Sequence, residues 1–146
     1  MFFRKLISKV INIISNFFGI YYLKILGVTL GKGINLSGIP IVERKSNSTI
    51  KIGNDVVLCS RSQDTALGVS HPVILRTLRE GAEIFIGSDT GISGVSICAA
   101  KSVRIGERCL IGADVMIFDT DFHAIKADNR RYNKNHEDIS CKDVCI

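Results

Sequence analysis

Aliphatic residues recur every six positions through the middle of the chain, and a small residue follows most of them. The repeat runs through Ile86, Ile92 and Cys98, gains one extra residue, and resumes through Ile105, Ile111 and Ile117. Fainter copies precede it at Leu30-Gly31 and Ile52-Gly53. An α-helix repeats at about 3.6 residues and a single strand at about two, so this period indicates short strands joined by tight corners.

Three such strands would complete a triangular coil of about 18 residues, with coils stacked about 4.8 Å apart. The aliphatic residue points inward, the small residue allows the corner, and no coil can bury its core without a neighbour. The sequence therefore predicts a mainly β protein, with a parallel β-helix over 28–146 and loops at 59–72 and 124–138. The alternative is an irregular sandwich of short strands, which six successive matching phrases disfavour. The period alone leaves the handedness of the coils open.

A different period marks residues 1–27. The apolar residues of this segment share one side of a helical wheel: Phe3, Leu6, Ile7, Val10, Ile11, Ile14, Phe17, Phe18 and Tyr21. Polar or small residues such as Lys9, Asn12, Asn16 and Gly19 fall on the opposite side, so we expect an amphipathic helix. Such a helix can cap the open strand edge of the coils, or it can rest on an anionic membrane surface as a peripheral contact. The two roles are compatible.

Charge and cysteine content narrow the class of protein. The net charge is +5, and five basic residues precede the first acidic residue, Glu43. The rest of the chain is balanced, which argues against a nucleic-acid partner. None of the five cysteines forms a C-x-x-C pair, and Leu6–Ile20 contains too many polar residues for a signal peptide or a bilayer span. Cys98 and Cys109 stand at repeat positions where a small hydrophobic residue belongs, so we expect both in the core. We expect a cytoplasmic protein with free thiols, and a membrane contact of the helix would hold it at the inner face of the membrane.

The regular repeats end in a motif with chemical potential, Asp119-Thr120-Asp121-Phe122-His123. His123 follows Ile117 by six residues, so it stands where the next inward aliphatic residue is due. A polar ring in such a position breaks the core rule, and such breaks concentrate at functional sites. The polar stretch 124–138 that follows suggests a loop that walls a pocket.

These repeats, the DTDFH motif and the polar loop together resemble the hexapeptide-repeat acyltransferases, in particular the sugar and polysaccharide O-acetyltransferases. The resemblance covers roughly 28–146. It implies left-handed coils, a homotrimer with sites between neighbouring chains, acetyl-CoA as co-substrate, a sugar or glycan acceptor, and His123 as the catalytic residue. A γ-type carbonic anhydrase uses the same solenoid with three histidines, but His71, His123 and His136 do not reproduce its close histidine pair, so we expect no metal.

The chemistry suits a histidine. Neutral imidazole, with a pKa of about 6.5, can take the proton of a sugar hydroxyl as the oxygen attacks a thioester. The other ring nitrogen then needs a carboxylate or carbonyl partner, and we favour Asp121. For Asp121 and Asp119 alike, the alternative is a solvated or turn-forming aspartate. Asp119, Ser93 and Gly94 are the candidate substrate-binding residues. For Ser93 and Gly94, whose matching region lines the acceptor site in relatives, the alternative is the small-residue rule of the repeat.

The chain departs from the resemblance at its end. Relatives continue through further coils that hold CoA, so we expect either a fragment of a longer protein or a truncated product with an incomplete CoA site. Three functional readings stay open. They are an acetyl-CoA-dependent O-acetyltransferase, a catalytically silent remnant or binding module on the same scaffold, and an N-acyltransferase acting on an amino sugar.

Overall fold

The computed structural model describes residues 2–124, 139 and 141–146, with side chains from residue 10 onward. One long helix, α1, spans Phe2–Ile25, and the strands that follow are short. The strands are β1 (Thr29–Leu30), β2 (Asn35–Ser37), β3 (Ile41–Glu43), β4 (Thr49–Ile52), β5 (Val57–Cys59), β6 (Ile74–Thr77), β7 (Glu83–Ile86), β8 (Gly91–Ser93), β9 (Ser96–Ala99), β10 (Ser102–Ile105), β11 (Leu110–Ile111), β12 (Met116–Phe118) and β13 (Val144–Cys145). A single 3-10 turn, Ser62–Asp64, lies between β5 and β6 within this described part.

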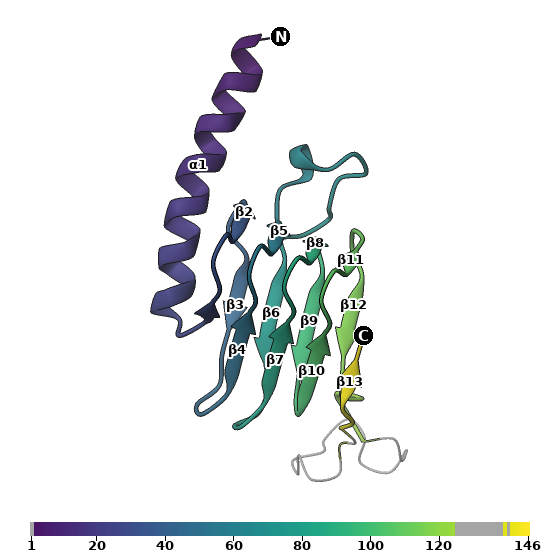
Figure 1. Cartoon of the computed structure of the whole chain (residues 1–146). Coiled ribbons are helices and arrows are strands. Elements are labelled where there is room, and N and C mark those ends of the chain that lie inside the picture. Colours follow the sequence, from purple (N-terminus) through teal and green to yellow (C-terminus); the bar gives the residue numbers. More distant parts are fainter. Residues whose placement is uncertain (1, 125–138, 140) are drawn as a thin grey trace.

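Successive strands enter three parallel sheets in rotation (Figure 1). The first sheet has the order β1-β4-β7-β10-β13, the second β11-β8-β5-β2 and the third β12-β9-β6-β3. Three successive strands, one in each sheet, make one round of the chain. The register repeats from one round to the next: Ile84 lies opposite Val103 and Ile86 opposite Ile105. The protein is therefore mainly β, with three stacks of parallel strands, an arrangement compatible with a parallel β-helix.

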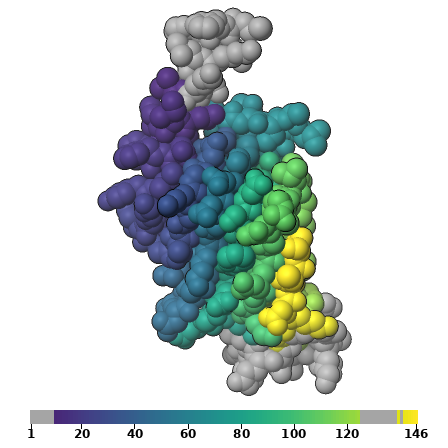
Figure 2. Space-filling view, in the orientation of Figure 1, coloured from purple at the N-terminus to yellow at the C-terminus, as the bar shows by residue number. Residues whose placement is uncertain are grey.

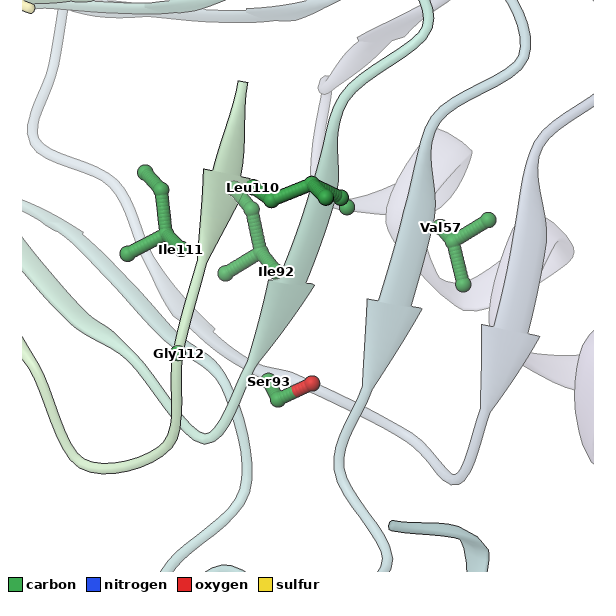
Figure 3. A pocket seen from close by; sticks show the side chains of 7 residues that line it. Val57, Ile92, Ser93, Leu110, Ile111 and Gly112 are labelled. Carbon is green, nitrogen blue, oxygen red and sulfur yellow. The ribbon is translucent and has the colours of Figure 1, made fainter. Parts of the chain in front are cut away.

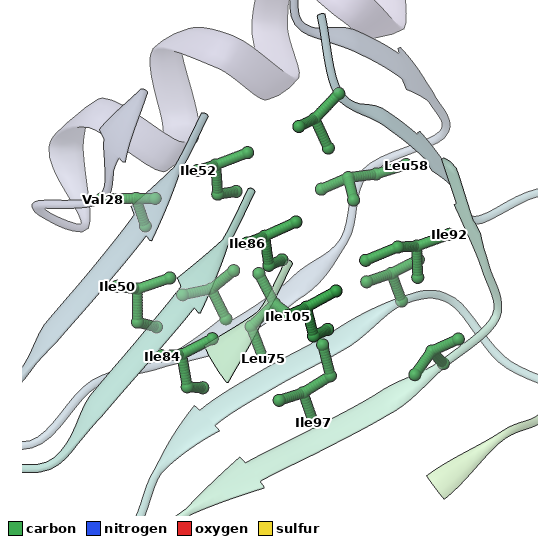
Figure 4. Close-up of a cluster of buried hydrophobic side chains, with 14 of the residues drawn as sticks. Val28, Ile50, Ile52, Leu58, Leu75, Ile84, Ile86, Ile92, Ile97 and Ile105 are labelled. Atoms are coloured by element: carbon green, nitrogen blue, oxygen red, sulfur yellow. The ribbon is translucent and has the colours of Figure 1, made fainter. Parts of the chain in front are cut away.

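The aliphatic residues of the repeat line the space between the three stacks (Figure 4). Strand by strand, exposed and buried residues alternate, as in Thr49–Ile52, where Ile50 and Ile52 are buried and Lys51 is exposed. Ile86, Ile92, Ile105 and Ile117 are all buried, which confirms that these repeat positions point inward. Burial of such side chains stabilises a fold by about 1.5–3 kcal/mol each, so the interior is the main source of stability.

One repeat position was assigned wrongly from the sequence. Cys98 was expected in the core, but it lies on the outward row, opposite Arg76 and Phe118, and is half-buried. Ile97 takes the inward position and is fully buried. The corner before it is one residue shorter than the period of six, because Gly94 turns the chain with a φ of 54°. Cys109, in contrast, packs against the core as expected.

Glycines at the corner between the first and second sheets allow successive rounds to approach closely. A Cβ atom on Gly87 would lie 2.4 Å from the carbonyl oxygen of Gly106, and one on Gly53 would lie 2.7 Å from the backbone nitrogen of Ser88. Both contacts are with backbone atoms, which cannot move aside without disturbing the hydrogen bonds between rounds. At this corner, the small residue after the aliphatic one is thus required by the spacing of the stacked strands.

Helix α1 packs beside β2, in the first round (Figure 1), but with its polar side inward. Asn12 and Asn16 are half-buried, Gly19 and Leu23 are buried, and the aromatic side of the helix is exposed. The Oδ1 atom of Asn16 accepts a hydrogen bond of 2.8 Å from the backbone nitrogen of Leu36, on the open edge of β2. The helix covers this end of the stack, as the cap interpretation expects, although its apolar stripe does not take part.

We predict that Gly87→Ala lowers the free energy of unfolding by about 1–3 kcal/mol, because the added methyl group would press on the backbone of the next round. Gly112→Ala is the matched control: Gly112 also follows an isoleucine, but a Cβ atom there meets nothing within 4 Å. Urea unfolding followed by circular dichroism measures both. Equal stability of the two variants would refute the close-approach explanation.

Candidate active site

The corner after β12 is held in place by a buried carboxylate. Asp119 accepts three hydrogen bonds from the turn one round below, from the backbone nitrogens of Ala100 at 2.6 Å, Lys101 at 2.7 Å and Ser102 at 2.7 Å. Its side chain is therefore fully engaged by the scaffold, in the turn-forming role that was the alternative for this residue. This geometry gives no support to the expectation that Asp119 binds substrate.

The chain leaves and re-enters the stack at this corner. Thr120 forms an antiparallel bridge with Cys141, and the carbonyl oxygen of Asp119 accepts a 3.0 Å hydrogen bond from the backbone nitrogen of Lys142. Val144 then joins the first sheet opposite Val103 and packs against the core. The expectation that His123 occupies the next core position is therefore wrong. Val144 occupies it, because the chain turns outward after Thr120.

His123 lies on the surface, four residues after the anchored Asp119. Its Nδ1 atom is 3.3 Å from the carbonyl oxygen of Ala124. A carbonyl oxygen only accepts hydrogen bonds, so this contact requires the proton on Nδ1, and Nε2 is then the basic nitrogen of the neutral ring. A backbone carbonyl was one of the two partners expected for this ring.

An aromatic pair accompanies the histidine. The rings of Phe118 and Phe122 are 5.4 Å apart between centroids and tilted by 55°, and both are about half exposed. Phe122 has a φ of 59°, which is unusual for a bulky residue, and its backbone nitrogen is 3.3 Å from the Oγ1 atom of Thr120. Backbone strain of this kind is maintained only by surrounding structure, here the anchored corner. Asp121 is also exposed, and its pairing with His123 stays a prediction.

Ser93 and Gly94 lie at the other end of the third sheet. Ser93 ends β8 and contributes to a shallow hollow on the outer face of the second sheet, together with Val57, Leu110 and Gly112 (Figure 3). Strand β9 follows Ser93 and pairs in register with β12, which precedes Asp119. At about 3.3 Å per residue, roughly 15–20 Å separate Ser93 from the histidine corner. One chain therefore does not bring these predicted residues together.

Gly94 has a packing role. A Cβ atom there would lie 2.6 Å from the Cβ atom of Val69 and 3.1 Å from the carbonyl oxygen of His71, both in the loop between β5 and β6. The same loop is tied down by Asp114, whose carboxylate accepts hydrogen bonds from the backbone nitrogen of Ser70 at 2.9 Å and its Oγ atom at 2.7 Å. These bonds hold the pKa of Asp114 below its usual value. The sequence alone does not reveal this tether, because aspartates are common at turns and their presence there does not indicate a long-range hydrogen bond.

The other reactive side chains of the described residues give weaker support for a catalytic role than His123 does. Burial raises the pKa of the Cys98 thiol, although the nearby Arg76 guanidinium opposes this shift, so the thiol stays protonated at neutral pH and is a poor nucleophile. No three histidine, cysteine or acidic side chains in the described residues cluster as metal ligands would. His136 lies outside the residues that the structure describes.

Comparison with known proteins adds no further constraint: no protein-family model, curated protein or solved structure matches this chain. The candidate site contains one exposed imidazole with a defined ring partner. It follows directly in sequence on Phe122, one ring of the aromatic pair, at a corner that a buried carboxylate fixes.

We expect Asp119→Asn to lower the free energy of unfolding by about 3 kcal/mol, since a neutral amide cannot accept all three backbone hydrogen bonds in a buried site. Asp121→Asn makes the same chemical change on an exposed neighbour and should leave stability within about 0.5 kcal/mol of the unsubstituted chain. Urea unfolding is the measurement. Similar losses in both variants would contradict the anchoring role.

The tether between Ser70 and Asp114 predicts a pH response. Because the folded pKa of Asp114 is lowered, its contribution is present above the unfolded value, near 3.8, and is lost as pH falls through the lower folded value. In Ser70→Ala the titration midpoint of the Asp114 carboxyl, followed by carbon NMR, should therefore rise toward 3.8. Ser46→Ala, at an exposed serine elsewhere, should not change it. An unchanged midpoint in Ser70→Ala would exclude the tether as the cause.

Proposed function

We propose that this protein is an acyltransferase that transfers an acetyl group from acetyl-CoA to a hydroxyl of a sugar or glycan precursor, with His123 as the general base. The observation that carries the proposal is the exposed His123 ring, whose Nδ1 atom faces the Ala124 carbonyl, so that Nε2 is the basic nitrogen of the neutral ring. The resemblance of the repeats and the DTDFH motif to sugar O-acetyltransferases supplies the substrate class.

The reaction needs one base and no covalent enzyme intermediate. Nε2 of His123 takes the proton of the acceptor hydroxyl while the oxygen bonds to the thioester carbonyl carbon. The carbon–sulfur bond then breaks, and the proton passes from the imidazolium to the departing thiolate. The anchored corner contributes by fixing the histidine, because a base accelerates proton transfer only when it is held within hydrogen-bond reach.

We propose further that the three stacks are the faces of a left-handed β-helix and that the active unit is a homotrimer. The separation of Ser93 from His123 supports this arrangement, since the two residues can contribute to one site only if they come from different chains. Outward-facing apolar residues on the last described rounds, such as Leu110 and Met116, are available for contact between chains. Asp121 is proposed as an additional partner of the histidine ring.

His123→Ala should reduce release of the CoA thiol from acetyl-CoA by about 10²–10⁴, the usual contribution of a general base. The measurement is thiol release with a panel of sugars, detected with a disulfide reagent. Alkali-labile product would show an ester and hence O-acetylation, whereas alkali-stable product would show an amide on an amino sugar. Lys51→Ala is the control, because Lys51 is an exposed, outward-facing residue of β4, in an earlier round than either Ser93 or His123.

Sedimentation velocity must accompany this assay, so that a lost trimer is not mistaken for a lost base. If the unsubstituted chain releases the CoA thiol and His123→Ala releases it at the same rate, the role of His123 is contradicted. The absence of release from an intact trimer with every sugar would favour the silent binding module.

A further inference from the structure

Helix α1 presents its apolar side away from the protein. The residues that meet the body follow a spacing of three or four positions and are mostly small or polar, with Ile20 and Leu23 as apolar exceptions: Asn12, Asn16, Gly19, Ile20 and Leu23. The opposite side carries large hydrophobic residues that are mostly exposed, among them Ile13 at 70%, Phe17 at 72% and Ile25 at 66%. An amphipathic helix on a water-exposed domain normally has the reverse orientation.

Three contacts fix this orientation. Asn16 accepts a hydrogen bond from the backbone nitrogen of Leu36, and the Oδ1 atom of Asn12 accepts one of 2.6 Å from the Arg61 guanidinium. Gly19 packs so tightly on Leu36 that a Cβ atom would lie 2.7 Å from its Cδ1 atom. Rotating the apolar side inward would break both hydrogen bonds and drive bulky side chains into β2. The exposed side is therefore a built feature of the fold.

The described part of the exposed side is long. From Val10 to Ile25 the helix extends about 24 Å at 1.5 Å per residue. In Figure 1 the C-terminal half of the helix lies beside β2 at one edge of the strand stack, and in Figure 2 the purple side chains of the helix lie at the surface, uncovered by the strands. Contiguous exposed apolar surface of this size marks a contact with a protein or a membrane.

The charge of the segment selects between these partners. Arg4, Lys5, Lys9 and Lys24 lie in the helix, and no acidic residue precedes Glu43. Lys24 is exposed on the apolar side itself, at the C-terminal end of the helix, one position before Ile25. A second copy of the helix would bring like charges together, whereas anionic phospholipid headgroups would neutralise them. No helix in the described part of the chain is long and apolar enough to cross a membrane.

We propose that α1 is a membrane-surface anchor that lies in the interface of an anionic bilayer, with Phe17, Tyr21 and their apolar neighbours among the acyl chains and Lys24 at the headgroups. Aromatic and aliphatic side chains opposite a polar face, combined with basic residues, are the features that hold helices at such interfaces. The Asn12, Asn16 and Gly19 contacts then join the anchor rigidly to the strand stack. This inference does not depend on the proposed acyl transfer.

The test is co-sedimentation of the full chain with vesicles of phosphatidylcholine, alone or mixed with phosphatidylglycerol. We expect binding to the mixed vesicles that weakens as salt is raised. Phe17→Asp should weaken this binding by at least about tenfold, because it removes a ring that would be buried in the bilayer and adds a negative charge. Leu67→Asp is the matched control, with the same kind of change at a residue 92% exposed in the loop between β5 and β6, and it should bind like the unsubstituted chain.

Lys24→Glu tests the charge separately and should weaken binding to the mixed vesicles by roughly fivefold or more. Circular dichroism of each variant checks that the fold is retained. The anchor would be disproved if the unsubstituted chain failed to bind the mixed vesicles, or if Phe17→Asp bound as well as Leu67→Asp. Self-association that Phe17→Asp abolishes, without any vesicle binding, would overturn the proposal in favour of a second copy. Equal binding to neutral vesicles would overturn the anionic specificity.

Discussion

The whole structure depends on the close approach of successive rounds of strands. Each strand forms its backbone hydrogen bonds with the strand one round before or after, so the rounds must lie one strand spacing apart along their full path, corners included. Side chains are easily accommodated on the straight segments, where they point inward or outward. At the corner between the first and second sheets they are not, because even one methyl group on Gly53 or Gly87 would meet the backbone of the next round.

The same constraint determines where the chain can form loops. An insertion within a strand would interrupt the hydrogen bonds between rounds, whereas an insertion at a corner leaves them intact. The loop between β5 and β6 leaves from a corner, and Asp114, from a corner two rounds later, holds it through Ser70. Asp119 anchors its own corner, from which the chain continues to His123, to the turn one round earlier. The candidate site thus follows directly on a fixed corner.

This architecture explains what the sequence could and could not predict. The repeat predicted the inward positions of Ile86, Ile92, Ile105 and Ile117, because a buried face tolerates few residue types. It failed at Cys98 because the corners differ in length, which shifts the phase of a fixed period. It identified His123 as exceptional but assigned it to the core, since a return of the chain at Val144 has no local signal. The partners of Asp119 and Asp114 lie many residues away in sequence, beyond the reach of any local pattern.

Helix α1 illustrates most clearly the limit of prediction from the sequence. A hydrophobic pattern shows that a helix has two different sides, but the surface that receives the helix decides which side is buried. Here that surface is the open edge of β2, which offers unpaired backbone groups as well as the side chain of Leu36. A hydrogen-bond acceptor such as Asn16 and a residue without a side chain such as Gly19 satisfy that edge better than an aromatic ring. Once the polar side is used in this way, the apolar side has to find its partner outside the fold.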